Sequence, residues 1–400
     1  MADVRNYALV TAAYWTFTIT DGALRMLVLL HFHRLGYTPL DLAFLFLLYE
    51  TMGIMTNLFG GWIGARFGLR ITLFAGLTIQ IVALLMLSAL NPEWALALSV
   101  AYVMAAQAFS GIAKDLTKMS SKSAVKLVVG ENAHGLLFKW VALLTGSKNA
   151  LKGLGFLLGG VMLQWMGFKT SLWLMAGSLA FVLLLAVSFV RSDLGKFKLV
   201  CWHDLFIQSR SIYLLSAARV FLFASRDVWF VVGVPVFLYS SIGWSFDEVG
   251  LFMASWIIGY GIIQASVPKL LRRTQGTASA AFAVRGWGLG LAVIPALIAI
   301  GLQYNGSPLI LIAGLMLFGF VFAVNSSLHS YLIVAYSDQK KVTVNVGFYY
   351  MANAVGRLLG TLLSGLVYQL AGLEACLWVS TVMTVIAAAL VIFLPTKNKD

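Results

Sequence analysis

Apolar runs of roughly 18 or more residues recur from one end of this sequence to the other. A helix needs about 20 apolar residues to cross the hydrocarbon core of a bilayer. Hydrophobic residues make up 60% of the 400 residues and charged residues 11%, far from the composition of a soluble globular protein. The sequence therefore predicts an all-α polytopic membrane protein, with no nucleic-acid partner.

The apolar runs predict about twelve transmembrane helices joined by short loops. Their expected ranges are 7–31, 41–65, 71–90, 94–114, 134–164, 170–190, 211–239, 247–268, 277–301, 307–336, 342–371 and 374–394. The first run starts near Tyr7 without a cleavage site, so we expect no removable targeting peptide. Two cysteines are too few to predict a disulfide framework or a zinc cluster.

The distribution of Lys and Arg predicts the topology, because short cytoplasmic loops keep an excess of positive charge. Of the 28 basic residues, 18 fall in connections on one side of the predicted spans, whereas only Arg34 and Lys169 fall on the other. Both termini belong to the basic side. We therefore expect both termini to be cytoplasmic.

An internal repeat divides the chain into a six-helix bundle at 1–190, a linker at 191–210 and a second six-helix bundle at 211–400. GYTPLD (36–41) matches GWSFDE (243–248), each with a Thr or Ser cap and an acid three residues later. At an offset of 205, the first repeat's Lys152, Gly155, Gly160, Gln164 and Gly167 match Arg357, Gly360, Gly365, Gln369 and Gly372. Two pseudo-symmetric repeats are similar to the architecture of major facilitator transporters, which hold substrate between the halves.

The stretch GGWIGARFGLR (60–70) resembles the loop between helices 2 and 3 of that superfamily. The matching residues are Gly61, Arg66, Gly68 and Arg70, while Ala65 stands where the superfamily usually has an acid. Two interpretations are open: a gating loop, or a tight turn whose arginines set the topology.

Eight basic residues fall inside the predicted spans, and only three central acids accompany them. The basic residues are Arg25, Lys139, Lys148, Lys152, Arg219, Arg226, Arg285 and Arg357, and the acids are Asp21, Glu50 and Asp227. A charge at a helix centre costs roughly 2.5 to 3.5 kcal/mol facing lipid, so these side chains must face a cavity or one another. Asp21 and Arg25 lie one turn apart and predict an internal ion pair. Glu50 has no basic neighbour in sequence, which makes it the preferred proton carrier over Asp21 and Asp227.

Apart from Lys139 and Arg285, the basic residues inside the spans predict a substrate site. We expect Lys148, Lys152, Arg219, Arg226 and Arg357, with Arg25 as a further member, to bind a compact multivalent anion such as a phosphate or arsenate ester. The competing interpretation is a set of unrelated salt bridges. No metal site, cofactor or catalytic residues are predicted, and an enzyme is not expected.

Four blocks make a more specific resemblance: TDGALRMLVLLHFHRLGY (20–37), SGIAKDLTKMSSKSAVKL (110–127), KWVALLTGSKNALKGLGF (139–156) and LSAARVFLFASRDVWFVV (215–232). Over its whole length the chain resembles the ArsJ family of organoarsenical efflux permeases. The resemblance implies export of 1-arseno-3-phosphoglycerate across the bacterial inner membrane, arsenate resistance, and glyceraldehyde-3-phosphate dehydrogenase as functional partner. The alternatives are an importer or exchanger of glycolytic phosphate esters, and a membrane sensor or scaffold that recruits the soluble dehydrogenase.

Lysines at every fourth position mark the cytoplasmic end of one predicted helix: Lys114, Lys118, Lys122 and Lys126. Such a stripe is typical of anchoring to anionic lipid headgroups. The alternative is a basic mouth that concentrates an anionic substrate or docks the dehydrogenase.

Overall fold

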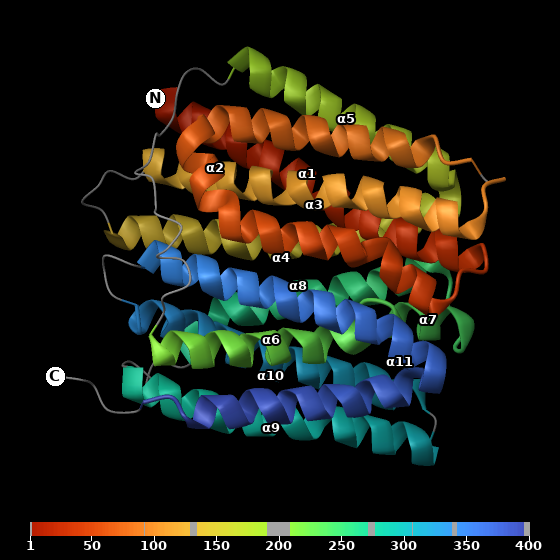
Figure 1. The fold of residues 1–400 in the computed structure, drawn as a ribbon, viewed down its shortest axis with the longest axis vertical. Helices are drawn as coiled ribbons and strands as arrows, with labels where there is room; N and C mark the ends of the chain where they lie inside the picture. The colour runs from red at the N-terminus through yellow and green to blue at the C-terminus, as the bar shows by residue number, and fades with distance from the viewer. Residues whose placement is uncertain are drawn as a thin grey trace. The chain divides into compact units, whose positions relative to one another are not determined.

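A computed structural model describes the chain at residues 2–91, 93–128, 134–189, 209–270, 277–305, 307–337 and 342–395. This described part forms eleven helices and no strand (Figure 1): α1 Ala2–Arg34, α2 Pro39–Ser88, α3 Leu96–Val128, α4 His134–Met166, α5 Phe168–Phe189, α6 Arg210–Phe230, α7 Gly233–Ser240, α8 Phe246–Leu270, α9 Thr277–Asn305, α10 Pro308–Ala335 and α11 Val342–Ile392. Nine segments among these residues are long and apolar enough to cross a membrane. The all-helical multi-span architecture is confirmed, whereas the count of twelve and the cytoplasmic termini stay predictions.

Two pairs of predicted spans share one helical assignment each. The spans 41–65 and 71–90 both belong to α2, within which Pro39–Asn57 and Arg70–Ser88 are separate candidate membrane spans. Thr56 at the end of the first span contacts Asp115 of α3, whereas Thr72 and Met86 of the second contact Ser120 and Tyr102, so the chain reverses direction between the two spans as predicted. The spans 342–371 and 374–394 are two helices that share the label α11 and meet at Gly372, whose backbone is not helical (φ 75°, ψ −170°).

The predicted span 211–239 is divided between α6 and α7. The amides of Val232 and Gly233 at this break both donate to the Ser364 hydroxyl of α11, at 3.1 Å each. A break inside the bilayer requires partners for the backbone groups it releases. A single serine on a neighbouring helix therefore makes the interruption possible.

The chain forms two compact units. The N unit contains residues 1–36, 44–200 and 245–258, and the C unit contains residues 37–43, 201–244 and 259–400. In the N unit, α1 packs against α3, α4 and α5. A Cβ at Gly155 or Gly159 would collide with the carbonyl oxygen of Ile19 or Ala23, so glycine is what permits α4 to approach α1.

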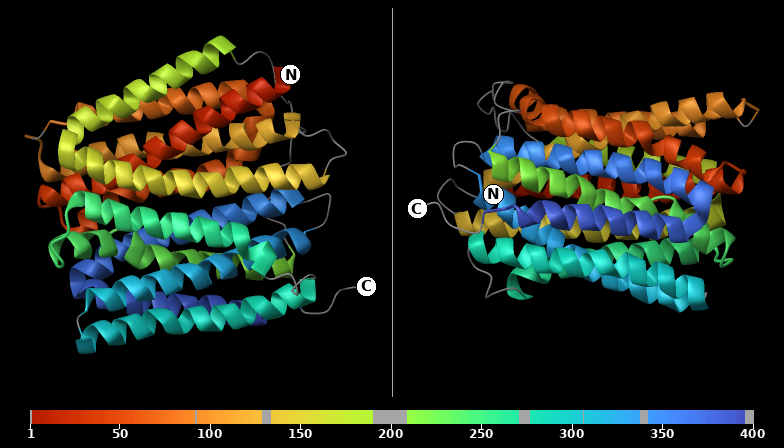
Figure 2. Two further views of the ribbon diagram at one scale, coloured as in Figure 1. Left: turned by 180° about the vertical axis from the view of Figure 1, so that it is seen from behind. Right: turned by 60° about the horizontal axis from the view of Figure 1, so that its bottom comes forward.

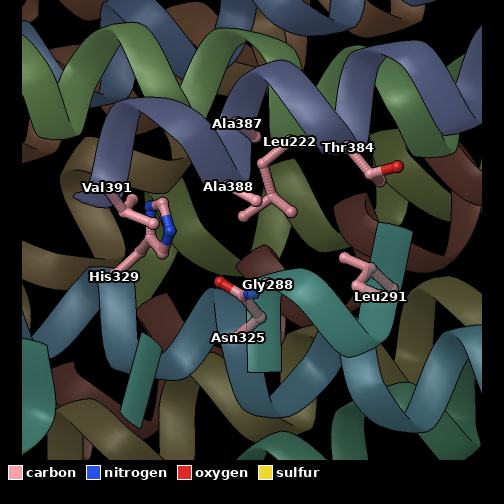
Figure 3. A pocket seen from close by; sticks show the side chains of 9 residues that line it. All are labelled: Leu222, Gly288, Leu291, Asn325, His329, Thr384, Ala387, Ala388 and Val391. Carbon is pink, nitrogen blue, oxygen red and sulfur yellow. The ribbon is translucent and has the colours of Figure 1, made fainter. Parts of the chain in front are cut away.

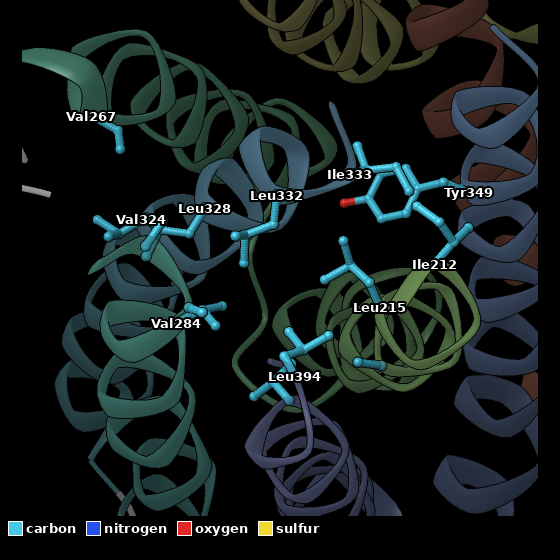
Figure 4. Packing of buried hydrophobic residues seen from close by; sticks show 14 residues of the cluster. Ile212, Leu215, Val267, Val284, Val324, Leu328, Leu332, Ile333, Tyr349 and Leu394 are labelled. Atoms are coloured by element: carbon cyan, nitrogen blue, oxygen red, sulfur yellow. The ribbon is translucent and has the colours of Figure 1, made fainter. Parts of the chain in front are cut away.

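In the C unit, α11 packs against α6, α7, α9 and α10, and the helices lie side by side in both views (Figure 2). Gly356 faces the Val220 carbonyl and Gly360 faces the Ala224 carbonyl, which brings α11 close to α6. Buried apolar side chains from α6, α8, α9, α10 and α11 pack together in this unit, among them Leu215, Val284 and Leu332 (Figure 4).

The sequence repeat is visible in the backbone at its corners. Four glycines have positive φ: Gly36 and Gly243, separated by the offset of the GYTPLD and GWSFDE match, and Gly167 and Gly372, which match at 205. The capping boxes that the sequence predicts after the first pair are confirmed. The Thr38 hydroxyl donates to Asp41 at 2.7 Å, and the Ser245 hydroxyl donates to Glu248 at 2.8 Å.

Candidate functional site

Arg219 of α6 is the most deeply buried of the candidate cations, with 4% of the residue exposed. Its Nε donates to Asn353 Oδ1 at 3.1 Å, and one terminal nitrogen donates to the Ser326 hydroxyl and carbonyl at 2.9 and 3.2 Å. The guanidinium lies 4.1 Å from the Phe223 ring centroid and 4.9 Å from that of Tyr349. None of the described carboxylates forms an ion pair with Arg219, and its hydrogen bonds among the described residues are all to neutral groups.

Asp227 joins the other two arginines of the C unit. Its Oδ1 accepts from Arg226 Nε at 2.6 Å, and its Oδ2 lies 3.5 Å from Arg357 Nε. The Arg226 guanidinium also lies within 6 Å of the Phe223, Phe230 and Phe322 ring centroids. Arg226 and Arg357 are thus partly compensated, contrary to the expectation of unmatched cations, because Asp227 can bridge α6 and α11.

The structure corrects the ion pair predicted in the N unit. Arg25 of α1 donates to Glu50 of α2 at 3.1 Å, whereas Asp21 accepts from the Tyr49 hydroxyl at 2.7 Å. Packing of α1 on α2 brings together residues 25 positions apart, which sequence spacing could not reveal. Glu50 therefore has a basic neighbour after all, and the reason for preferring it as proton carrier is lost.

Asp115 of α3 is a buried acid that sequence reasoning missed, because the predicted span ended at residue 114. It is fully buried, accepts from the Thr56 hydroxyl at 2.5 Å, and pairs with Lys118 at 3.2 Å. Lys118 also donates to Asn57 at 2.9 Å. The helix α3 continues to Val128, beyond the end of its apolar run. Asp115 lies on the face of this continuation that is buried against neighbouring helices.

These contacts change the interpretation of the lysine stripe. Lys118 is held by Asp115 and Asn57, and Lys114 Nζ lies 4.0 Å from the Tyr49 ring centroid. Both lysines therefore pack between helices of the N unit rather than standing free at a mouth. The side chains of Lys122 and Lys126 lie outside the described residues.

The remaining predicted residues lie on two N-unit helices. Lys148 and Lys152 are half-buried on α4, where Lys152 Nζ is 5.8 Å from the Phe156 ring centroid. Arg70 lies 5.3 Å from the Phe74 centroid, and the Arg66 side chain and the surroundings of Gly61 and Gly68 lie outside the described part. Convergence of these residues with the C-unit arginines stays a prediction.

A small cavity in the C unit lies among α6, α9, α10 and α11 (Figure 3). Its volume of about 10 Å³ has room for about one water molecule. Asn325 Oδ1 and His329 Nδ1, both buried and without a hydrogen-bond partner among the described residues, belong to its lining. The cavity is too small for an organic ester.

Apolar helices that carry buried, partly compensated charges are typical of multi-span membrane proteins in which charged side chains face the protein interior. The family model of the Major Facilitator Superfamily matches residues 8–284 and 215–400, which together include nearly the whole chain. The chain belongs to this superfamily of membrane transporters. No curated protein matches the sequence.

Two solved structures share the fold. One is a POT family transporter in complex with a thioalcohol-conjugated peptide, with a TM-score of 0.77, 16% identity, and coverage of 99% of this chain and 97% of the other. The second is a POT family transporter in complex with 5-aminolevulinic acid, with a TM-score of 0.78, 15% identity and the same coverage. At these identities the likeness shows the fold alone.

Proposed function

We propose that the chain exports a small organic arsenate ester, 1-arseno-3-phosphoglycerate, across the bacterial inner membrane by alternating access. The substrate name follows from the ArsJ resemblance of the four sequence blocks. Under this proposal, glyceraldehyde-3-phosphate dehydrogenase is the functional partner that makes the ester. Basic side chains of both units, including Lys148 and Lys152, are required for transport.

Arg219 carries the proposal. A buried cation without a carboxylate is costly, because its lost hydration is repaid only partly by neutral acceptors. An anionic ligand would supply the missing charge, and a guanidinium binds a tetrahedral oxyanion through paired N–H groups. A binding role would explain why this charge is retained in the C unit.

The chemistry of the site favours pentavalent over trivalent arsenic. Trivalent arsenic prefers soft thiolates, by the ligand-matching logic that applies to metals. Cys376 is the only cysteine within the described residues; it is fully buried in the C unit and takes no part in the described contacts of Arg219 or Arg226. An arsenate or phosphate ester instead offers hard oxygens, which suit arginine.

The test is uptake into inverted membrane vesicles supplied with the dehydrogenase, its substrates and labelled arsenate. We expect uptake to require the dehydrogenase, because free arsenate is not the substrate. Arg219→Gln should reduce uptake at least 10-fold, whereas Arg219→Lys should retain part of it. The matched control is Arg285→Gln, since Arg285 donates to the Val391 and Leu394 carbonyls near the end of α11 and plays no part in the proposal.

Three results would contradict the proposal. Normal uptake by Arg219→Gln would show that Arg219 does not bind the anion. Equal uptake of free arsenate would remove the ester as substrate. Efficient counterflow with 3-phosphoglycerate would favour the exchanger of phosphate esters instead.

A further inference from the structure

Arg219 differs from the other paired arginines in the kind of group opposite its guanidinium. Arg25 faces Glu50, and Arg226 and Arg357 face Asp227. Arg219 faces Asn353, at the 3.1 Å separation that Arg25 has from its carboxylate. A neutral amide thus occupies a place where the protein elsewhere uses an acid.

The amide can meet the guanidinium in only one orientation. A guanidinium is a donor without acceptors, so Asn353 must present its carbonyl oxygen and direct its NH₂ group elsewhere. Aspartate has nearly the same shape and would offer an ionised oxygen at the same position. Steric fit therefore does not explain why residue 353 is an asparagine rather than an aspartate.

The rest of the Arg219 environment fixes the guanidinium without neutralising it. Ser326 accepts two of its hydrogen bonds, and Tyr260 donates to the Ser326 hydroxyl at 3.4 Å. The ring centroids of Phe223 and Tyr349 lie 4.1 and 4.9 Å from the guanidinium carbon of Arg219. These contacts orient the side chain and leave its formal charge for another partner.

We infer that Asn353 is a specificity-determining residue, because its neutral amide holds Arg219 in place while keeping it available to an anionic substrate. The inference rests on the proposed function of Arg219. An acid at residue 353 would act as a permanent competitor for the guanidinium. Asn353 itself is a positioning residue and need not touch the substrate.

The experiment compares Asn353→Asp with Asn353→Ser in the vesicle assay with enzymatically generated ester. Asn353→Asp should raise the KM at least 10-fold while the apparent melting temperature in detergent stays equal or rises, because a new ion pair forms. Asn353→Ser removes the amide without adding a charge and should therefore raise the KM clearly less than Asn353→Asp does. Asn345→Asp adds the same charge elsewhere on α11, where Asn345 donates to Ser337, and should leave the KM unchanged.

Arg219→Gln, measured in parallel, separates the two proposals. If Arg219→Gln transports normally, the anion contact itself is wrong. If Arg219→Gln is inactive and Asn353→Asp transports with a wild-type KM, only the inference about Asn353 is overturned. Should Asn353→Asp fail to insert, Ser326→Asp places a carboxylate beside the same guanidinium, and a wild-type KM there would likewise reject the inference.

Discussion

The N unit and the C unit treat buried charge differently. In the N unit, Arg25 pairs with Glu50 and Lys118 pairs with Asp115, so acids and bases meet one to one in these contacts. In the C unit, the interface of α6 and α11 holds three arginines and one aspartate. The first arrangement pairs each charge within the fold, whereas the second has more bases than acids among the described residues, which is the basis of the proposed anion site.

This difference shows that the count of charges in a span is a poor guide to function. The partner of each charge decides whether it is structural or available. Arg25 and Arg219 are both intramembrane arginines, yet only Arg219 lacks a carboxylate among the described residues. The following predictions test whether the two units differ as these contacts indicate.

The largest effect is expected from Asp227→Asn. Loss of the carboxylate leaves Arg226 and Arg357 without their shared counter-charge, and breaking a buried pair costs about 3–5 kcal/mol. The apparent melting temperature in detergent should fall strongly. Glu374→Gln, at an exposed acid of α11, is the control and should melt like the wild type. An unchanged melting temperature for Asp227→Asn would mean that water or lipid compensates the arginines.

Glu50→Gln should destabilise the N unit by about 3 kcal/mol, because Arg25 loses its single carboxylate. The double variant Glu50→Gln with Arg25→Gln should recover part of the loss, since both charges are then removed. A double variant that is no more stable than Glu50→Gln would show that the pair is not coupled.

Matched glycine substitutions compare the helix contacts of the two units. Gly155→Ala would push a Cβ into the Ile19 carbonyl, and Gly360→Ala, at the matching position, would push one against the Asp227 side chain and the Ala224 carbonyl. Each should cost about 1–3 kcal/mol through overpacking. Gly290→Ala, where no atom lies within 4 Å of the added Cβ, is the control. Clearly unequal losses at Gly155 and Gly360 would break the equivalence of the two repeats.

The smallest effect concerns a pair of glutamines matched at the repeat offset. Gln369 Oε1 accepts from the Leu40 amide at 3.0 Å in the first turn of α2, so Gln369→Ala should cost about 1 kcal/mol. Gln164 is exposed, and Gln164→Ala should stay within about 0.5 kcal/mol. Thermal melting of both variants measures the difference, and equal values would contradict it.

Properties that depend on periodicity and local chemistry could be predicted from the sequence. The apolar runs gave the helices, and the Thr38 and Ser245 caps formed as expected because capping involves residues three apart. The Asp21–Arg25 pair was predicted wrongly, since one-turn spacing permits a contact without excluding a better partner on another helix. Asp115 was missed because hydropathy marks where a span ends in lipid, not where a helix stops packing. No sequence pattern marks Asn353, because the role inferred for it depends on its contact with the Arg219 guanidinium.

The matched corners at Gly36 and Gly243 have a practical consequence. Each begins with a glycine of positive φ, followed by a hydroxyl and an acid that cap the N-terminus of the next helix. The two hexapeptides 36–41 and 243–248 thus form the same turn and the same cap. We therefore expect that either hexapeptide can replace the other. A chimaera carrying one hexapeptide at both corners would test whether the two corners are still structurally equivalent or only share an evolutionary origin.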